Sequence, residues 1–153
     1  MTTLTTPACR RAAHGFTALE LLAVVTIAGI LASLAVPSYG IYIKRSHVLD
    51  AAMRLSDHRA KMEQYFLDHR SYVDATAACG VAPPARANGD LFDVGCVGTA
   101  STYRVTVTGR TGGAMAGFAY ATDETGARVT LAVPQGWTRT PDCWTTRPDG
   151  SCL

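Results

Sequence analysis

The stretch GFTALELLAVVTIAGILASLAVPSYGIYI, residues 15–43, carries a single charged side chain, the carboxylate of Glu20. The run that follows Glu20 is apolar, and its mildly polar members are Thr26, Ser33 and Ser38. A carboxylate at the edge of a membrane-length apolar segment is costly unless it has a partner. Glu20 is therefore a candidate functional residue, and the apolar run beside it decides whether the chain is inserted in a membrane.

The apolar stretch has the length of a transmembrane helix. About 20 apolar residues at 1.5 Å each cross the ~30 Å hydrocarbon core of a bilayer. We expect residues 16–43 to form such a helix, because a signal peptide has a shorter apolar core and ends at a small-residue cleavage site. Arg10 and Arg11 precede the run, which favours a cytoplasmic N-terminus. Lys44 and Arg45 on the far side oppose that bias.

Two motifs frame this run. Gly15-Phe16-Thr17-Ala18-Leu19-Glu20 begins it, and Pro37-Ser38-Tyr39 lies near its end. Together they resemble the prepilin signature of the type IV pilins and their pseudopilin relatives. The resemblance implies that residues 1–15 are a leader, that a prepilin peptidase cuts after Gly15, and that the new N-terminal residue Phe16 is N-methylated. Ala18 departs from the signature, since a larger apolar residue is usual at that position.

The resemblance also implies how the helix is used. In a fibre, the Glu20 carboxylate of one subunit would pair with the Phe16 ammonium of its neighbour. Such a pair in an apolar core selects register more than it adds stability. Gly29 and Pro37 are weak points of the helix, because proline removes an i→i−4 hydrogen bond; in the family this stretch can melt on assembly. The alternative for Glu20 is a carboxylate that only reaches the membrane surface.

After Lys44 the pattern becomes amphipathic. One face carries apolar residues at helical spacing, namely Val48, Ala52, Leu55, Met62 and Phe66. The other face carries three i,i+4 pairs of opposite charge, namely Asp50–Arg54, Asp57–Lys61 and Arg59–Glu63. We expect one helix from Phe16 to about Tyr72, roughly 80 Å long at 1.5 Å per residue.

The remainder reads as a small β-sheet head. Residues 74–100 are loop-like, with several alanines, glycines and prolines. Alternation then predicts strands over 103–108, 117–122 and 129–133, separated by turns. A long helix beside a small antiparallel sheet is an α+β fold, similar to that of type IV pilins. The expected parts are the leader (1–15), the membrane and fibre-core helix (16–43) and the head (44–153).

Four cysteines remain after the leader, which contains Cys9. An even number outside the cytoplasm suggests disulfides, and three pairings are possible. Short enclosed loops favour Cys79–Cys96 and Cys143–Cys152, and the family often has a disulfide-closed C-terminal loop. No C-x₂-C spacing supports a zinc site instead.

The sequence offers no chemistry for catalysis. His47, His58 and His69 are eleven residues apart on the helix, about 16 Å between neighbours. They therefore cannot share a metal within one chain, and we expect exposed side chains, with bridging between subunits as the alternative. No G-x-S-x-G, H-E-x-x-H or phosphate-cradling motif occurs. We expect no enzyme, no metal and no cofactor.

The net charge of the chain bears on whether nucleic acid is a partner. The formal charge of +2 includes Arg10 and Arg11, so twelve basic and twelve acidic side chains follow the leader. This balance does not imply general nucleic-acid binding. Scattered solvated charges are the favoured reading, and a local arginine patch is the alternative; the arginines in question are Arg104, Arg110, Arg128, Arg139 and Arg147. Trp137 and Trp144 are expected to close the core, with exposure for contact with partners as the alternative.

The resemblance predicts a structural subunit of a type IV pilus, a minor pilin rather than the bulk subunit, serving adhesion, twitching motility or DNA uptake. Its partners would be other pilin subunits, the prepilin peptidase, the inner-membrane assembly platform and the membrane, with DNA as a further candidate. The subunit would begin as a single-pass inner-membrane protein with a periplasmic head, and end in an extracellular pilus. The alternatives are a pseudopilin of a type II secretion system and a DNA-binding receptor pilin.

Overall fold

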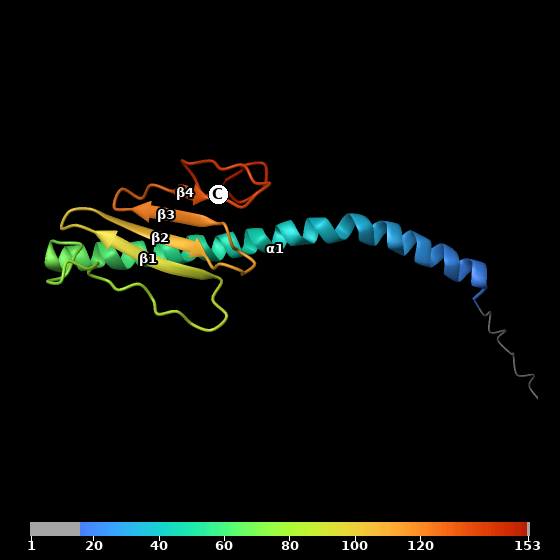
Figure 1. Ribbon diagram of the computed structural model, residues 1–153, viewed down its shortest axis with the longest axis horizontal. Coiled ribbons are helices and arrows are strands. Elements are labelled where there is room, and N and C mark those ends of the chain that lie inside the picture. The colour runs from blue at the N-terminus through green and yellow to red at the C-terminus, as the bar shows by residue number, and fades with distance from the viewer. Residues whose placement is uncertain (1–15, 153) are drawn as a thin grey trace, which may run out of the picture. The chain divides into compact units, whose positions relative to one another are not determined.

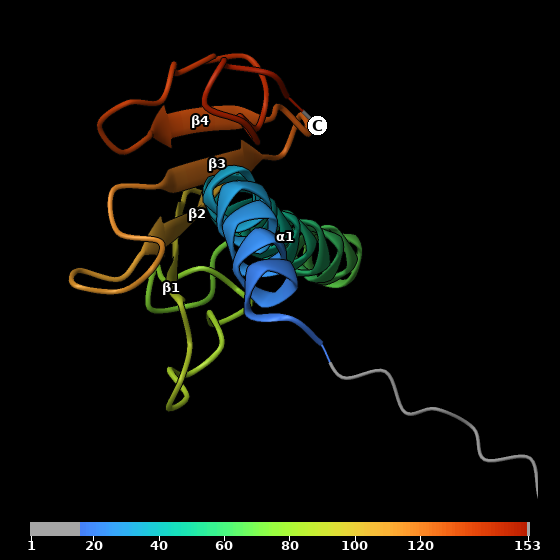
Figure 2. The same cartoon turned by 90° about the vertical axis from the view of Figure 1, so that its right-hand side faces the viewer.

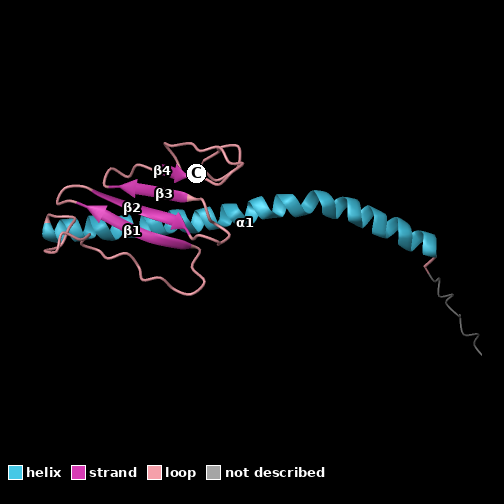
Figure 3. Cartoon of the chain, in the orientation of Figure 1, coloured by secondary structure: helices cyan, strands magenta, loops and turns pink. Residues whose placement is uncertain are grey.

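A computed structural model describes residues 16–152, with the side chains of residues 34–38 left aside. One helix, α1 (Ala18–His69), is followed by four strands: β1 (Phe92–Gly98), β2 (Tyr103–Gly109), β3 (Ala119–Asp123) and β4 (Val129–Ala132). Figures 1 and 3 show these elements. The chain divides into two compact units, one ending at Ser38 and one beginning at Tyr39. The leader residues, Gly15 among them, lie outside the described part.

The first unit is the N-terminal part of α1. The hydroxyl of Thr17 accepts a hydrogen bond from the Glu20 amide at 3.2 Å, which is an N-cap with glutamate at the third helical position. The helix runs through Gly29 and Pro37 without interruption. The large apolar side chains from Phe16, just before the helix, to Leu31 are 55–82% exposed, and they are Phe16, Leu19, Leu21, Leu22, Val24, Val25, Ile27, Ile30 and Leu31.

Over the described residues, no helix combines the length and the apolarity that crossing a membrane requires. The expected membrane span over residues 16–43 therefore stays a prediction.

In the second unit, α1 packs against one face of the sheet, as Figure 2 shows. The expected core face is confirmed at Val48, Leu55 and Met62, which are at most 1% exposed. The periodicity continues through two further buried residues, Ala51 and His58. The apolar ones, Val48, Ala51, Leu55 and Met62, form one cluster with Phe118, which precedes β3, and with strand residues that include Phe92, Tyr103, Val105 and Val107.

The expectation that His58 is exposed is wrong. Its side chain is 3% exposed, although we expected all three helix histidines on the surface. The reason is the helical period, which places residue 58 between Leu55 and Met62 on the core face. Its Nε2 is buried and has no hydrogen-bond partner among the described residues. Burial lowers the pKa of His58 below its ordinary value.

The helix ends at His69, three residues before the predicted end. Arg70 adopts a left-handed backbone with φ of 56°, and its amide donates to the Phe66 carbonyl at 2.8 Å. A residue in this conformation is a common helix terminator. The chain then turns back toward the sheet at Tyr72, which stacks on Phe66 with 4.4 Å between ring centroids.

The sheet is antiparallel with strand order β1-β2-β3-β4. The three predicted strands are present with shifts of one or two residues. The fourth, β1, falls in the stretch that we expected to be a loop, and it pairs with β2 from Phe92↔Gly109 to Gly98↔Tyr103. Two glycines and an aspartate make β1 a poor strand by propensity, so its pairing with β2 and its packing on the core decide its conformation.

Two of the three predicted charge pairs on α1 form. Arg54 contacts Asp50 at 3.0 Å and Lys61 contacts Asp57 at 2.7 Å. The third, Arg59–Glu63, is absent from the ion pairs of the described residues.

Glu63 is engaged by two tyrosines instead. It accepts hydrogen bonds from the Tyr72 and Tyr103 hydroxyls at 3.0 and 2.9 Å. Burial, together with these bonds, raises the pKa of both phenols. Glu63 thereby joins the end of α1 to the segment after it and to β2.

Two disulfides are present, and they are the two pairs favoured by their short loops. Cys79 is joined to Cys96 with a Cα–Cα distance of 6.1 Å, and Cys143 to Cys152 with 5.9 Å. The first ties the segment after α1 to β1, and the second closes the C-terminal segment. Both distances lie in the ordinary range for disulfides.

His58 makes stability depend on pH. Its folded-state pKa lies below the unfolded value near 6.5, so only the unfolded state gains this proton as the pH falls through 6.5. We expect the free energy of unfolding to fall between pH 7 and 5, by at most about 1.4 kcal/mol per pH unit. Urea denaturation of the head from Tyr39 onward measures it.

The control is His69→Gln, because that ring is exposed on the same helix. His58→Gln should flatten the profile between pH 7 and 5, whereas His69→Gln should leave its slope unchanged. An equal slope in the His58→Gln protein would contradict the assignment.

Removing the second disulfide should loosen one segment only. In Cys143→Ser/Cys152→Ser the unfolded chain regains the entropy of a short loop, so we expect a loss of about 2–3 kcal/mol. Hydrogen exchange should speed up over residues 134–152, while β2 and β3 remain protected. Exchange that rises equally in all strands would show that this disulfide supports the whole head.

Candidate nucleic-acid interface

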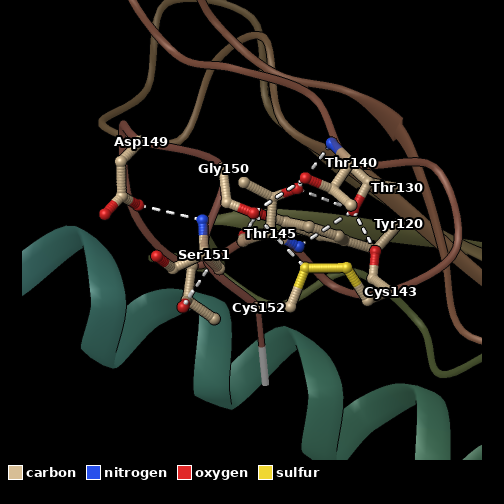
Figure 4. The surroundings of a disulfide bond; sticks show 10 residues. Tyr120, Thr130, Thr140, Cys143, Thr145, Asp149, Gly150, Ser151 and Cys152 are labelled. Atoms are coloured by element: carbon tan, nitrogen blue, oxygen red, sulfur yellow. Dashed lines mark hydrogen bonds between the residues drawn. A yellow bond between two sulfur atoms is a disulfide. The ribbon is translucent and has the colours of Figure 1, made fainter.

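The C-terminal segment, residues 133–152, folds back on β3 and β4 through threonines. The Thr130 hydroxyl donates to the Cys143 carbonyl and accepts from the Thr145 amide, the latter at 2.9 Å. The Tyr120 hydroxyl donates to the Thr145 carbonyl at 2.9 Å. Figure 4 shows these contacts around the Cys143–Cys152 disulfide. The segment is therefore held on the sheet by buried polar contacts and one covalent bond.

Trp144 anchors the same segment in the core, as expected for both tryptophans. It is 6% exposed, and its indole N–H donates to the Ala121 carbonyl at 3.0 Å. The Arg128 guanidinium lies over the Trp144 ring, 5.1 Å from its centroid. Trp137 meets Phe118 edge to face at 4.8 Å. Arg128 thus presents its charge on a fixed aromatic support.

Arg139 and Arg147 stand beside one backbone hydrogen bond. The Thr138 amide donates to the Pro148 carbonyl at 2.9 Å, so Arg139 follows one end of this bond and Arg147 precedes the other. Both arginines are exposed. One Arg139 N–H donates to the Thr130 carbonyl at 3.3 Å, which fixes the guanidinium and leaves its other N–H groups for other acceptors.

The remaining two candidate arginines lie elsewhere. Arg104 is on β2, paired in register with Asp123, and Arg110 donates to the Asp90 carbonyl at 3.1 Å. The five arginines considered from sequence therefore do not form one patch. Of the other three, Arg139 and Arg147 belong to the C-terminal segment, and Arg128 directly precedes β4.

None of the ion pairs formed by the described residues includes Arg128, Arg139 or Arg147. They join Arg54 to Asp50 and Asp90, Lys61 to Asp57, and Arg86 to Asp93. The two acids of the segment are exposed, and hydrogen bonds from Ser151 lower the pKa of Asp149. The segment and Arg128, which directly precedes β4, thus offer three guanidinium groups that can donate hydrogen bonds to a phosphate.

The predicted assembly residues lie on the other unit. Phe16 is 82% exposed, and Glu20 is in the first turn of α1. The Thr17 cap binds the backbone amide of Glu20, and the T-x-x-E pattern would have indicated this helix start. The roles of Phe16, Glu20, Gly29 and Pro37 concern contacts between chains, and that of Gly15 concerns a peptidase, so all of them stay predictions.

Among the described residues, no three His, Cys, Asp or Glu side chains come together as a metal site.

Comparison with known proteins identifies the family of this chain. A family model described as "Type IV minor pilin ComP, DNA uptake sequence receptor" matches residues 37–119. Among curated proteins, the type IV major pilin protein PilE1 of Neisseria gonorrhoeae is 36% identical over 70 residues, which are 46% of this chain and 42% of that protein. The fimbrial protein EcpC of Eikenella corrodens is 34% identical over 88 residues, 58% of this chain and 56% of that protein.

A third relative is the type IV major fimbrial protein FimA of Dichelobacter nodosus, 42% identical over 60 residues, or 39% of this chain and 38% of that protein. The chain thus spans about half, or less, of the length of these curated relatives. The model match covers more than half of the chain and contains the second half of α1, β1 and β2. By that match, this protein belongs to the type IV pilin family.

Proposed function

We propose that this pilin is a minor subunit that binds duplex DNA through its C-terminal segment, as a receptor for DNA uptake. The observation that carries the proposal is the set of three arginines, Arg128, Arg139 and Arg147, held on a cross-linked frame without carboxylate partners among the described residues. The description of the matching family as a DNA uptake sequence receptor supports it.

The charge balance decides how such binding would work. With twelve basic and twelve acidic side chains after the leader, the whole chain exerts little net attraction on DNA. Affinity must therefore come from a few guanidinium–phosphate contacts, each of which releases counterions and contributes about 0.9 to the salt slope. Binding should consequently be weak at physiological salt and strongly salt-dependent.

As a type IV pilin, the protein has its place in the pilus at the cell surface. We further propose that it enters the fibre through residues 16–43 after cleavage behind Gly15 and methylation of Phe16. The large apolar side chains from Phe16 to Leu31, 55–82% exposed in the single chain, need cover from lipid before assembly and from neighbouring helices after it. The peptidase, the assembly platform, the inner membrane and other pilins are the partners that this route requires.

The second candidate is the bulk fibre subunit, working in adhesion or twitching motility. It is favoured by the relatives named as major pilins. Mass spectrometry of sheared fibres separates the two, since a minor subunit is present at low copy number and a major subunit forms most of the fibre. The same spectra show whether the chain begins at methylated Phe16.

Neutralising two C-terminal arginines should weaken DNA binding. In Arg139→Gln/Arg147→Gln, two phosphate contacts are lost, so the slope of log K against log salt should fall by about 2. Fluorescence anisotropy of a labelled duplex measures it, with the head from Tyr39 onward. This head contains every core residue that the described part of the chain has.

The matched control is Lys61→Gln/Arg86→Gln. It changes net charge equally, but both of its cations already face carboxylates, Asp57 and Asp93, at 2.7 and 2.8 Å. Its affinity should stay near that of the parent protein. No salt-sensitive binding by the parent head would overturn the DNA proposal, and equal losses in both double variants would remove the C-terminal site.

Removing the Glu20 carboxylate should block assembly. If it pairs with the Phe16 ammonium of a neighbour, Glu20→Ala leaves a buried ammonium unpaired, at about 3–5 kcal/mol. The subunit should then stay in the membrane fraction and be depleted from sheared fibres, as measured by immunoblot of both fractions.

Thr17→Ala is the control for the helix cap. It removes the hydroxyl that accepts the Glu20 amide, at about 1 kcal/mol, and keeps the carboxylate. Incorporation should survive in Thr17→Ala and fail in Glu20→Ala. Equal failure of the two would assign Glu20 to the helix start rather than to pairing.

A further inference from the structure

A second positively charged site lies between α1 and the turn that follows β3. It is a pocket of about 210 Å³, and its lining includes Ser56, Arg59, Thr122, Gly126, Arg128 and Trp144. A cavity needs about 10–15 Å³ by this measure to hold one water, so this pocket has room for a larger polyatomic group. Two of its walls are guanidinium groups, from different elements.

The first guanidinium is fixed by a glycine. Gly126 has φ of 80°, and a Cβ at that position would lie 3.0 Å from Arg59 Cζ. The glycine therefore serves both the left-handed turn and the close approach of Arg59. The Arg59 Nε is buried without a hydrogen-bond partner among the described residues. A buried donor left in this way costs free energy, so it calls for an acceptor or for a functional reason.

The second guanidinium is fixed by an aromatic ring. Arg128 is exposed and lies 5.1 Å above the centre of the Trp144 ring, and Trp144 is itself held by its bond to Ala121. Within the described residues, no ion pair includes Arg59 or Arg128. Two cations thus line one pocket, each positioned by packing rather than by a carboxylate.

The carboxylates around the pocket have partners elsewhere. Glu63, which also lines the pocket, accepts from two tyrosine hydroxyls. Asp123 closes its own turn by accepting from the Thr125 amide and hydroxyl and from the Ala127 amide. Glu124 accepts from the Tyr103 amide at 3.2 Å. All of these donors are neutral, so the three acids keep their charge, but no ion pair of the described residues joins any of them to Arg59 or Arg128.

We propose that this pocket binds one phosphate group of a DNA strand, clamped between Arg59 and Arg128. The planar guanidinium presents two parallel N–H groups to the oxygens of a phosphate, and two such groups can hold a tetrahedral anion from two sides. The identification of DNA as the source rests on the proposed function. It extends the interface from the C-terminal segment to α1, with Arg128 at the junction.

The fluorescence of Trp144 reports on the pocket directly. Trp137→Phe leaves Trp144 as the single tryptophan of the chain, beneath Arg128. We expect a saturable change in its emission when inorganic phosphate is added to the full-length protein in detergent micelles, and no such change with chloride at equal ionic strength. Absence of a saturable response to phosphate would overturn the proposal.

Substitutions of the two arginines test whether phosphate binds in this pocket. Losing one charge-assisted bond costs roughly tenfold or more in affinity, which we expect for phosphate with Arg59→Gln and with Arg128→Gln. Arg128 is exposed, so its variant tests the pocket even if Arg59→Gln fails to fold. The matched control, Arg104→Gln on β2, should bind phosphate like the parent protein. An equal loss in the control would overturn the assignment to this pocket.

A parallel measurement with DNA tests whether the bound phosphate belongs to a DNA strand. Arg59→Gln should also lower affinity for a labelled duplex, measured by anisotropy with the same full-length protein. If phosphate binding is lost in this variant while DNA affinity is unchanged, the assignment of DNA is overturned. If the parent chain binds phosphate in the pocket but no DNA at all, the proposed function fails and the anion pocket stands.

Discussion

The head depends on one packing contact, that between the core face of α1 and the sheet. Val48, Leu55 and Met62 meet a sheet surface that includes Val105 and Val107, and all five are at most 1% exposed. Burying side chains of this size contributes about 1.5–3 kcal/mol each. The two disulfides, the tyrosine contacts with Glu63 and the threonine network of the C-terminal segment all add to a core that this contact creates.

The sequence predicted the features that rest on a strong local pattern. The helix, three of the strands and the two cysteine pairs follow from periodicity, alternation and short loop lengths. The fourth strand was missed because its glycines and aspartate hide an alternation of Phe92, Val94 and Cys96. Its conformation depends on pairing with β2 and on the link to Cys79, and both are tertiary interactions that local propensity does not carry.

The candidate site was predicted less well, because charge partners depend on three-dimensional neighbours. Arg59 and Glu63 have the spacing of an ion pair, yet Glu63 is taken by two tyrosines from distant parts of the chain. Similarly, the five C-terminal-half arginines are alike in sequence, while the structure separates Arg104 and Arg110 from the other three. His58 shows the same limit, since position on the helical period outweighed the polarity of its ring.

The contacts of Glu63 also have a mechanical consequence. Its side chain links α1 to Tyr72, just after the helix, and to Tyr103, the first residue of β2. Tension applied to the helix is therefore passed to the sheet at this point by two hydrogen bonds to a carboxylate, in addition to the core. Hydrogen bonds to charged groups are stronger than neutral ones, so the C-terminal end of the helix resists peeling from the head under load.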